Sequence, residues 1–346
     1  MKDVAEDLGL SVVTISKVLR NHSDISEETR ERVLVRVREM GYRPNLAARS
    51  LVTGRSYLVG LIVPDLLHSF FAEVARAISE TLEHSGYYLI VSSSKEDASL
   101  EEREVDHLLG RRLDAVIIAS CRSTVELFFR IEKLGTPYVL IDRSFPGLAA
   151  NIVGVDDFAV GMIATKHLLD IGCKTIAHIR GPETSPGLHR LEGYKQALLA
   201  RGMKMRPEYI VAAPSDVESR VRGGDAMRQL LALHPRPDGV FCFNDPLAMG
   251  AMNYALDHGV KIPEDLALVG CGNLHYDDVL RVPLSSVNQH SHRIGEEAAR
   301  LTLAILKSKG PRAPESVVLY PELVVRASSQ RLARKRPVAS RARKSG

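Results

Sequence analysis

From residue 57 onward, short apolar runs alternate with segments of helical periodicity. The run Leu58-Val-Gly-Leu-Ile-Val63 is continuously apolar, which is typical of a strand buried on both faces. Further strands are predicted at residues 87–92, 115–119, 138–141, 152–155, 175–179, 209–212, 239–243 and 266–269, with helices between them. This alternation requires parallel sheets covered by helices. We therefore expect two consecutive doubly wound α/β units of similar size, with a ligand in the cleft between them at the carboxyl ends of strands.

Polar and aromatic residues follow the ends of several predicted strands. They are Asp65, His68, Phe70, Phe71, Asp142, Arg143, Asp156 and Asp157 in the first part, and Arg190, Phe241, Asn244 and Asp245 in the second. Carboxylates, an amide and an arginine beside aromatic rings suit a polyhydroxylated ligand, because paired hydroxyls take bidentate hydrogen bonds and rings cover apolar C–H surface. A single Asp could instead cap a helix, and a single Phe could be core. Convergence at the corresponding edge of both units favours a binding site.

The first 41 residues predict three short helices. The first ends at Gly9, and Ser11 is a suitable N-cap for the second, which runs to about Arg20. The third begins after Ser26 and ends at Gly41. Three helices of this length around a small apolar centre form a compact head.

The second of these helices has one apolar side. Ile15, Val18 and Leu19 share it, and the outward residues are Val13, Ser16, Lys17 and Arg20. A helix-turn-helix places such an outward face in the major groove of DNA. The alternative is a structural cap on a larger domain, but basic side chains next to uncharged ones favour DNA.

Tyr42-Arg-Pro-Asn45 interrupts the helical pattern, and residues 46–51 could form barely two turns. So short a helix is marginal alone, because nucleation costs more than a few hydrogen bonds return. Arg49 and Arg55 are basic, and Leu51 is an unaccompanied apolar residue, so a minor groove into which a leucine can wedge is one expected partner. A plain linker is the alternative.

The net charge of +4 is unevenly distributed. Residues 331–346 carry seven Lys or Arg and no acid, which leaves the remainder at −3. The first 58 residues carry ten basic and eight acidic side chains. A weakly acidic body with basic ends fits local contact with a polyanion. The tail itself is either a solvated, disordered terminus or an auxiliary nonspecific DNA contact.

Other functional classes lack their sequence signals. The four cysteines have neither disulfide-framework nor metal-ligand spacing, so we expect no metal or cofactor. No G-x-S-x-G, H-E-x-x-H or P-loop occurs, and Gly270-Cys-Gly272 lacks the third glycine of a dinucleotide fingerprint, so an enzyme is not expected. There is no apolar signal region and no window of about 18 apolar residues, so the expected location is cytoplasmic, at the nucleoid, and not in a membrane.

The sequence resembles the LacI/GalR family of bacterial transcription regulators over essentially its whole length. The matching head and hinge segments are D-V-A-x-x-L-G-x-S-x-x-T-I-S-K-V-L, S-E-E-T-R-E-R-V and G-Y-R-P-N-x-x-A-R-S-L. The later landmarks are V-G-L-I-V-P-D, R-L-E-G-Y and F-N-D-P-L-A-M-G-A. The resemblance implies an α/β protein with a helix-turn-helix head, a hinge helix and a periplasmic-binding-protein-like effector domain of two doubly wound parallel sheets.

The resemblance also implies a domain scheme. It consists of a head at 1–43, a hinge helix and linker at 44–56, an effector-binding and dimerisation domain at 57–330 and a basic disordered tail at 331–346. The chain would cross between subdomains near 157, 289 and 319. The N-subdomain would then hold about 57–157 and 289–318, and the C-subdomain about 158–288 and 319–330.

Site residues follow from the same motifs. The major-groove positions are Val12, Val13 and Lys17, the phosphate-contacting positions are Thr14, Ser16 and Asn21, and the hinge positions at the minor groove are Asn45, Ala48, Arg49 and Leu51. Lys17 would donate to a guanine edge, and the valines offer only apolar contact. The effector positions are Phe70, Phe71, Asp156, Arg190, Phe241, Asn244 and Asn273.

Several departures from the family pattern stand out. Lys2-Asp3 directly follow Met1, so either translation starts upstream or the first helix lacks an N-cap worth about 1 kcal/mol. Gly272 occupies a strand end that usually carries a ligand-binding Asp, which argues against a standard monosaccharide effector. Leu66-Leu-His-Ser69 replaces a polar loop, and no leucine-heptad extension follows, so we expect a dimer.

The expected function is that of a ligand-responsive repressor of a carbohydrate-uptake or catabolic operon. A homodimer would bind a near-palindromic operator in double-stranded DNA, and a sugar or sugar derivative would be the effector. A sugar-binding sensor without a DNA role is the first alternative, and the head argues against it. A sugar-processing α/β enzyme is the second, and the missing catalytic motif argues against that.

Overall fold

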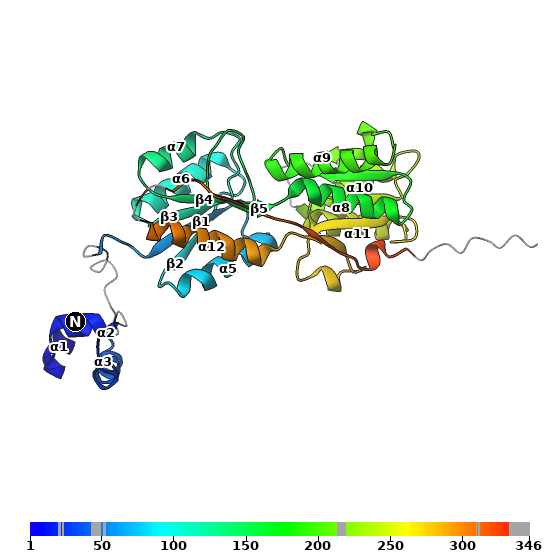
Figure 1. The fold of residues 1–346 in the computed structure, drawn as a ribbon. Coiled ribbons are helices and arrows are strands. Elements are labelled where there is room, and N and C mark those ends of the chain that lie inside the picture. The colour runs from blue at the N-terminus through cyan, green and yellow to red at the C-terminus, as the bar shows by residue number, and fades with distance from the viewer. Residues whose placement is uncertain are drawn as a thin grey trace, which may run out of the picture. The chain divides into compact units, whose positions relative to one another are not determined.

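The computed structural model describes residues 1–19, 22, 24–42, 50, 53–212, 219–308, 310 and 312–331. It divides into two compact units, Met1–Tyr57 and Leu58–Gly346. Each unit has its own hydrophobic core, and each is described by itself (Figure 1).

The first unit contains helices α1 (Lys2–Leu8), α2 (Val12–Leu19) and α3 (Glu27–Glu39). Gly9 ends α1 in the left-handed conformation, with φ of 64°. The hydroxyl of Ser11 accepts from the backbone N–H of Thr14 at 3.0 Å, and that of Ser26 accepts from Thr29 at 3.3 Å. The predicted helix signals at Gly9, Ser11 and Ser26 are thus confirmed.

Apolar side chains from all three helices form the centre of the head. They are Val4, Ala5, Ile15, Val18 and Val33, each at most 3% exposed. Met1 precedes α1 without a side-chain cap. The packing buries one side of α2 and leaves its other side to solvent.

The second unit is built on two six-stranded sheets. The first sheet has the order β11-β5-β4-β3-β1-β2 and is parallel throughout. Its strands are β1 (Leu58–Val63), β2 (Tyr88–Ser93), β3 (Ala115–Ile118), β4 (Tyr138–Ile141), β5 (Ile152–Val155) and β11 (Ser316–Leu319). Its helices are α5 (Ser69–Glu83), α6 (Ala98–Gly110), α7 (Glu126–Lys133) and α12 (Ser291–Lys307).

The second sheet has the order β12-β10-β9-β8-β6-β7, in which only the β10–β12 pair is antiparallel. Its strands are β6 (Ile176–Arg180), β7 (Ile210–Ala212), β8 (Gly239–Cys242), β9 (Ala267–Gly272), β10 (Ser285–Asn288) and β12 (Glu322–Val324). Its helices are α8 (Asp157–Asp170), α9 (Ser185–Ala200), α10 (Ser219–Leu231) and α11 (Asp245–Asp257), with short 3₁₀ turns at Pro207–Tyr209, Asp277–Val279 and Ala327–Ser329.

The two sheets of the second unit are not built from two consecutive halves of the sequence. Helix α12 packs on α5 of the first sheet, although it follows β10 of the second sheet (Figure 1). Strand β11 then pairs with β5, and β12 returns to pair with β10. The first sheet therefore takes its edge strand β11 from residues that follow most of the second sheet in sequence.

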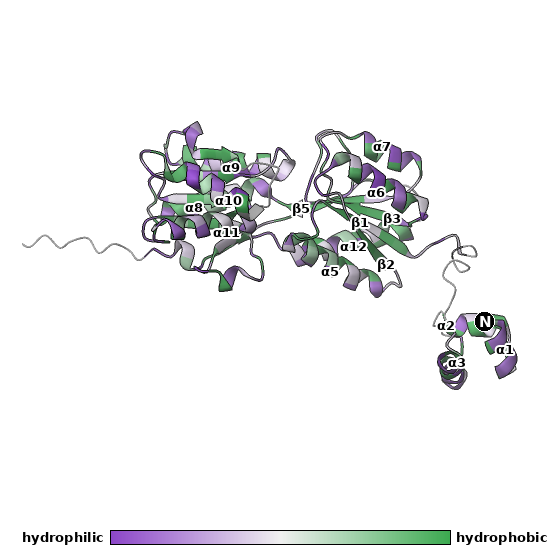
Figure 2. Ribbon diagram, turned by 180° about the vertical axis from the view of Figure 1, so that it is seen from behind, coloured by the Kyte–Doolittle hydropathy of each residue, from purple (hydrophilic) through white to green (hydrophobic). Residues whose placement is uncertain are grey.

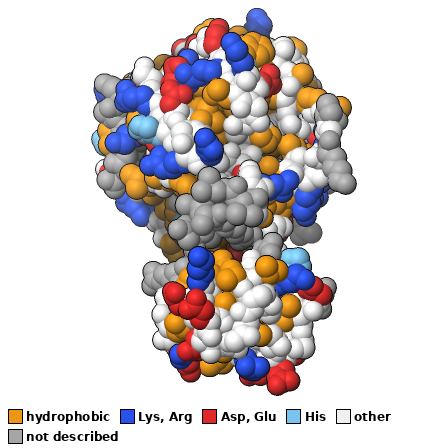
Figure 3. All heavy atoms as spheres, turned by 90° about the vertical axis from the view of Figure 1, so that its left-hand side faces the viewer, with side chains coloured by type: hydrophobic (Ala, Val, Ile, Leu, Met, Phe, Trp, Pro, Cys, Tyr) orange, Lys and Arg blue, Asp and Glu red, His pale blue; other side chains and the backbone are white. Residues whose placement is uncertain are grey.

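The predicted α/β class and its parallel sheets are confirmed, and all nine predicted strands are present with ends that differ by at most three residues. Strands β10, β11 and β12 were not predicted. In Figure 2 the strands are mostly hydrophobic, whereas the surrounding helices mix hydrophilic and hydrophobic residues. Basic and acidic side chains are interspersed on the face shown in Figure 3. No described helix combines the length and the apolar character needed to cross a bilayer.

The close packing of helices α8 and α9 beside the second sheet depends on glycine. A Cβ atom on Gly161 of α8 would lie 2.1 Å from the backbone oxygen of Arg190 in α9. A Cβ atom on Gly193 of α9 would lie 2.2 Å from the backbone oxygen of Phe158. Because Arg190 sits at this contact, the crossing of α8 and α9 also sets the position of its side chain.

Candidate functional site

Helix α2 exposes the face that was predicted to meet DNA. Val12 and Val13 are 41% and 62% exposed, whereas Ile15 and Val18 on the opposite side are buried. The side chain of Lys17 is 36% exposed. An apolar pair and a cation on one side of a short helix are the groups that can contact base edges in the major groove.

Two polar groups of this face already have partners within the head. The ammonium group of Lys17 lies 2.5 Å from the Asp24 carboxylate. The hydrogen bond from Lys17 holds the pKa of Asp24 below its usual range. The hydroxyl of Thr14 lies 2.9 Å from that of Ser11. Asp24 therefore engages one of the three N–H donors of Lys17, and two remain for a base.

The other predicted DNA positions differ in how they can be placed. Ser16 lies in α2 and is partly buried. Asn21, Asn45, Ala48, Arg49 and Leu51 lie outside the described residues. The basic residues after Arg331 lie outside them as well.

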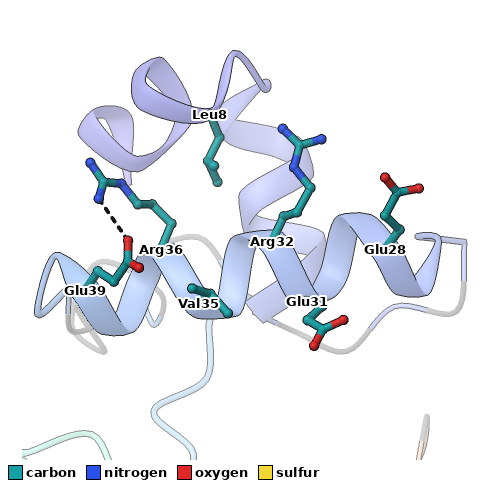
Figure 4. Close-up of a pocket in the computed structure, with 7 residues that line it drawn as sticks. All are labelled: Leu8, Glu28, Glu31, Arg32, Val35, Arg36 and Glu39. Atoms are coloured by element: carbon teal, nitrogen blue, oxygen red, sulfur yellow. Dashed lines mark hydrogen bonds and ion pairs between the residues drawn. The ribbon is translucent and has the colours of Figure 1, made fainter.

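The head also carries a surface hollow of about 430 Å³ between α1 and α3 (Figure 4). Its described lining is two aliphatic and five charged side chains: Leu8, Val35, Glu28, Glu31, Arg32, Arg36 and Glu39. Arg36 pairs with Asp7 at 2.5 Å and with Glu39 at 2.9 Å. Charged side chains without a ring or an amide do not suit a polyhydroxylated ligand.

A cavity of about 340 Å³ lies between the two sheets of the second unit, a volume within the range of small-molecule sites. Its lining includes four of the predicted effector positions: Phe70, Phe71, Arg190 and Asn244. From the first sheet's side it also includes Asp65, His68, Glu96, Asp142 and Arg143. From the second it includes Arg180, Gly181, Pro182, Thr184, Pro186, Arg222, Phe243 and Leu247, together with Gln289 beyond β10.

Arg190 is the best-held polar group of the cavity and is only 2% exposed. Its guanidinium donates to the Asp157 carboxylate at 2.8 Å, to the backbone oxygen of Phe243 at 2.7 Å and to Oε1 of Gln289 at 2.6 Å. The guanidinium carbon lies 4.6 Å from the centre of the Phe243 ring. Burial raises the pKa of Asp157, and the adjacent Arg190 opposes that rise. Arg190 thus joins α8, α9, the end of β8 and the segment after β10.

Arg143 is the corresponding buried cation on the side of the first sheet, 7% exposed. It donates to Glu96 at 2.9 and 3.3 Å and to the backbone oxygen of Ser120 at 3.0 Å. Its neighbour Asp142 has φ of 63°, and burial raises the pKa of Asp142 to about 6.

A close contact between two polar side chains spans the cavity. Nδ2 of Asn244 lies 3.2 Å from Nε2 of His68. Nδ1 of His68 accepts from the backbone N–H of Phe70, and Oδ1 of Asn244 accepts from that of Leu247. Burial lowers the pKa of His68 to about 4, so its ring is neutral at physiological pH.

Three predicted effector positions do not line this cavity. Phe241 is fully buried and stacks on His178 with ring centres 4.6 Å apart, because it still belongs to strand β8. Asp156 caps α8 by accepting from the backbone N–H of Ala159 at 2.9 Å. The side-chain oxygen of Asn273 accepts from Arg326 at 2.8 Å. These three residues lie outside the lining of this cavity, and their assignment to effector binding stays a prediction.

Residues close to Phe241 and Asp156 in the sequence make contacts at or beside the cavity. Phe243, two residues after Phe241, provides the aromatic surface, and it is the Phe of the F-N-D segment. Asp157, one residue after Asp156, pairs with Arg190. Gln289 was missed because β10 was not predicted, so no strand end marked its position.

The molecule can now be compared with known proteins. The model for bacterial regulatory proteins of the lacI family matches residues 1–45, and the periplasmic binding protein-like domain matches residues 165–329. The HTH-type transcriptional repressor CytR of Escherichia coli (strain K12) is 32% identical over 333 residues, which cover 96% of this chain and 96% of that protein. The chain belongs to the lacI family. It is accordingly a DNA-binding transcriptional regulator and not an enzyme.

Solved structures agree with membership of the lacI family. The transcriptional regulator CelR–cellobiose complex has a TM-score of 0.73 and 29% identity, covering 94% of this chain and 98% of that chain. The lac repressor dimer bound to operator and the anti-inducer ONPF has a TM-score of 0.79 and the same coverage. At 23% identity, the second likeness shows a shared fold.

Proposed function

We propose that this lacI-family protein is a repressor of a carbohydrate-uptake or catabolic operon, and that a small polyhydroxylated effector in the cavity between the two sheets controls its operator affinity. The observation that carries the DNA part is the exposed Lys17 on a helix whose opposite face is buried. The observation that carries the effector part is a cavity with a buried arginine and three phenylalanine rings. A transcriptional regulator of similar fold, CelR, is known as a complex with cellobiose, which supports a sugar-like effector.

In this proposal a homodimer binds a near-palindromic operator in the bacterial cytoplasm. Lys17 donates to a guanine edge, and Val12 and Val13 contact thymine methyl groups. Thr14, Ser16 and Asn21 bind phosphates, which fixes the position of the head without specifying sequence. Asn45, Ala48, Arg49 and Leu51 form the hinge contacts, with Leu51 wedged into the minor groove.

The proposed domain scheme follows the sequence boundaries, with the head at 1–43, the hinge at 44–56 and the effector domain at 57–330. An effector that contacts both sides of the cavity changes how the two sheets close on each other. Closure alters the dimer, and the dimer determines whether two hinges are presented to DNA together. The effector shifts DNA affinity only by its differential affinity for the two states.

A mobility-shift assay with the full-length protein and the DNA upstream of its own gene tests the DNA part. We expect tighter binding to this DNA than to random DNA of equal length. Lys17→Ala should reduce this preference by at least about tenfold, since one good base contact is worth about 1–3 kcal/mol. Lys204→Ala, an exposed lysine of the second unit, is the matched control.

Equal binding to both DNAs, unchanged by Lys17→Ala, contradicts the repressor proposal. It would favour a sugar-binding sensor without a DNA role. Leu51→Ala tests the hinge in the same assay and should weaken operator binding without changing the affinity of the cavity for its effector.

A further inference from the structure

The side-chain oxygens deep in the cavity already accept hydrogen bonds from the protein. Both carboxylate oxygens of Glu96 accept from Arg143. Oε1 of Gln289 accepts from Arg190, and Oδ1 of Asn244 accepts from the first turn of α11. A neutral sugar needs acceptors as well as donors, because each hydroxyl donates one hydrogen. Each of these oxygens therefore already uses one of its two lone pairs within the protein.

Several donors of the described lining remain open. Gln289 is only 4% exposed, and no described group accepts from its Nε2. The hydroxyl of Thr184 is buried and lacks a partner among the described residues. A buried donor without an acceptor costs free energy, so both groups favour a ligand that brings acceptor atoms.

The contact between Asn244 and His68 also presents hydrogen-bond donors that lack an acceptor. A neutral imidazole has one ring N–H, and Nδ1 of His68 accepts from Phe70, so the hydrogen is on Nε2. Oδ1 of Asn244 accepts from Leu247, so its amide N–H group faces His68. Two donors therefore face each other at 3.2 Å. A shared acceptor atom from a ligand can satisfy both.

Three helices begin at residues that line the cavity. His68 is the N-cap of α5, Thr184 that of α9 and Asn244 that of α11. These helices have 15, 16 and 13 residues. Each helix start carries roughly half a positive charge, and its open N–H groups favour an anion.

The guanidinium groups of the described lining are largely paired with carboxylates. Arg143 pairs with Glu96, Arg180 with Glu183 and Arg190 with Asp157. The attraction for an anion therefore comes from the helix starts and from the open donors.

The packing at the end of β9 explains why Gly272 stands where the family pattern usually has a ligand-binding Asp. A Cβ atom on Gly272 would lie 2.6 Å from Oδ2 of Asp245. Asp245 is fully buried, bonded to Ser286 at 2.7 Å and to Asp277, which is also fully buried. The carboxyl groups of Asp245 and Asp277 stabilise each other's position in the interior. A side chain at 272 would displace this pair, so the chain presents no acceptor there.

We propose that the effector is an acidic polyhydroxylated molecule whose carboxylate or phosphate group binds between Asn244, His68, Thr184 and Gln289, a proposal that rests on the effector role proposed above for this cavity. The anion accepts from the open donors at the helix starts. The rings of Phe70, Phe71 and Phe243 cover the apolar C–H surface of the remainder.

Thermal unfolding of the full-length protein tests this with sodium phosphate and sodium acetate as probes, against sodium chloride at equal pH and ionic strength. We expect one or both probes to raise the midpoint of the second unit's transition in a saturable manner. A response to phosphate alone identifies a phosphoryl group, and a response to acetate alone identifies a carboxylate. No protection beyond that of chloride overturns the proposal.

Asn244→Asp is the decisive variant, because aspartate retains the N-cap oxygen and removes the facing donor. Without a probe it should raise the midpoint, since Nε2 of His68 gains an acceptor. With a probe, its affinity should fall at least about tenfold, the factor expected for losing a hydrogen bond to a charged group. Asn253→Asp, on the same helix but outside the lining, is the matched control.

Equal protection of Asn244→Asp and the wild type places the anion elsewhere and also overturns the proposal. Failure of this inference is separable from failure of the repressor function. Operator binding is measured without any anion, whereas anion protection is measured without DNA. An uncharged sugar that changes operator affinity while both anions fail would leave the repressor proposal standing and this one refuted.

Discussion

Replacement of Arg190 by Met should strongly destabilise the second unit. The change keeps most of the side-chain volume but leaves the Asp157 carboxylate, 6% exposed, without its ion-pair partner. Breaking a buried pair in this way costs about 3–5 kcal/mol. The bonds to Phe243 and Gln289 are lost as well, so the upper part of that range is expected.

Removing the unpaired Asp157 carboxylate tests whether it causes the loss of stability. Arg190→Met with Asp157→Ala leaves no unpaired charge, so the double variant should be more stable than the single Arg190→Met by about 1–3 kcal/mol. Arg201→Met removes a similar pair with Asp170, but both side chains are nearly half exposed, and its cost should stay within about 1 kcal/mol.

Urea denaturation followed by circular dichroism measures the wild type, these three variants and the Asp157→Ala single variant, with the free energy of unfolding taken from the transition of the second unit. If Arg190→Met lowers the free energy of unfolding only about as much as Arg201→Met does, the stabilising role assigned to the Arg190–Asp157 pair is refuted. A double variant whose cost equals the sum of its single variants refutes the coupling.

Three further predictions concern glycine packing, the DNA-facing helix and pH. Gly193→Ala should cost more than about 2 kcal/mol in urea, because its Cβ meets backbone, whereas Gly110→Ala, with open space, should be neutral or stabilising; equal effects contradict the packing. Asp24→Asn should tighten operator binding in a mobility shift, because it removes a negative charge beside Lys17 that repels DNA phosphates; unchanged or weaker binding contradicts this. Burial beside a second carboxyl raises the pKa of Asp277, so the folded state holds a proton that the unfolded state releases above about pH 4, and stability falls as pH rises. Asp277→Asn should flatten this thermal-unfolding profile, and an unchanged slope would contradict it.

The sheets could be predicted because buried parallel strands leave a strong sequence pattern. Leu58–Val63, Tyr138–Ile141 and Ile152–Val155 have the predicted bounds, since continuous apolar runs leave little choice of limits. Ser285–Asn288 was not found, because a strand with three polar residues of four lacks that pattern. Its neighbours in the sheet, and not its own composition, place it there.

The site was predicted less well, because strand-end residues are sensitive to one or two positions. Successive side chains of a strand point to opposite faces, so the exact end of a strand decides which residue reaches the cavity. Phe241 lies inside β8, whereas Phe243 lies beyond it. Asp156 caps α8, whereas Asp157 pairs with Arg190. The residue types were right, and the local register determined their roles.

The interleaved sheets also affect how the protein is made. During synthesis on the ribosome, the first sheet has to wait for β11 at residues 316–319, and the second for β12 at residues 322–324. Neither sheet is complete until almost the entire chain has emerged, and Gln289 joins Arg190 only late. The head needs only its own helices and can fold far earlier. A chain cut short by a premature stop codon would therefore release a folded DNA-contacting head attached to an unfinished effector unit.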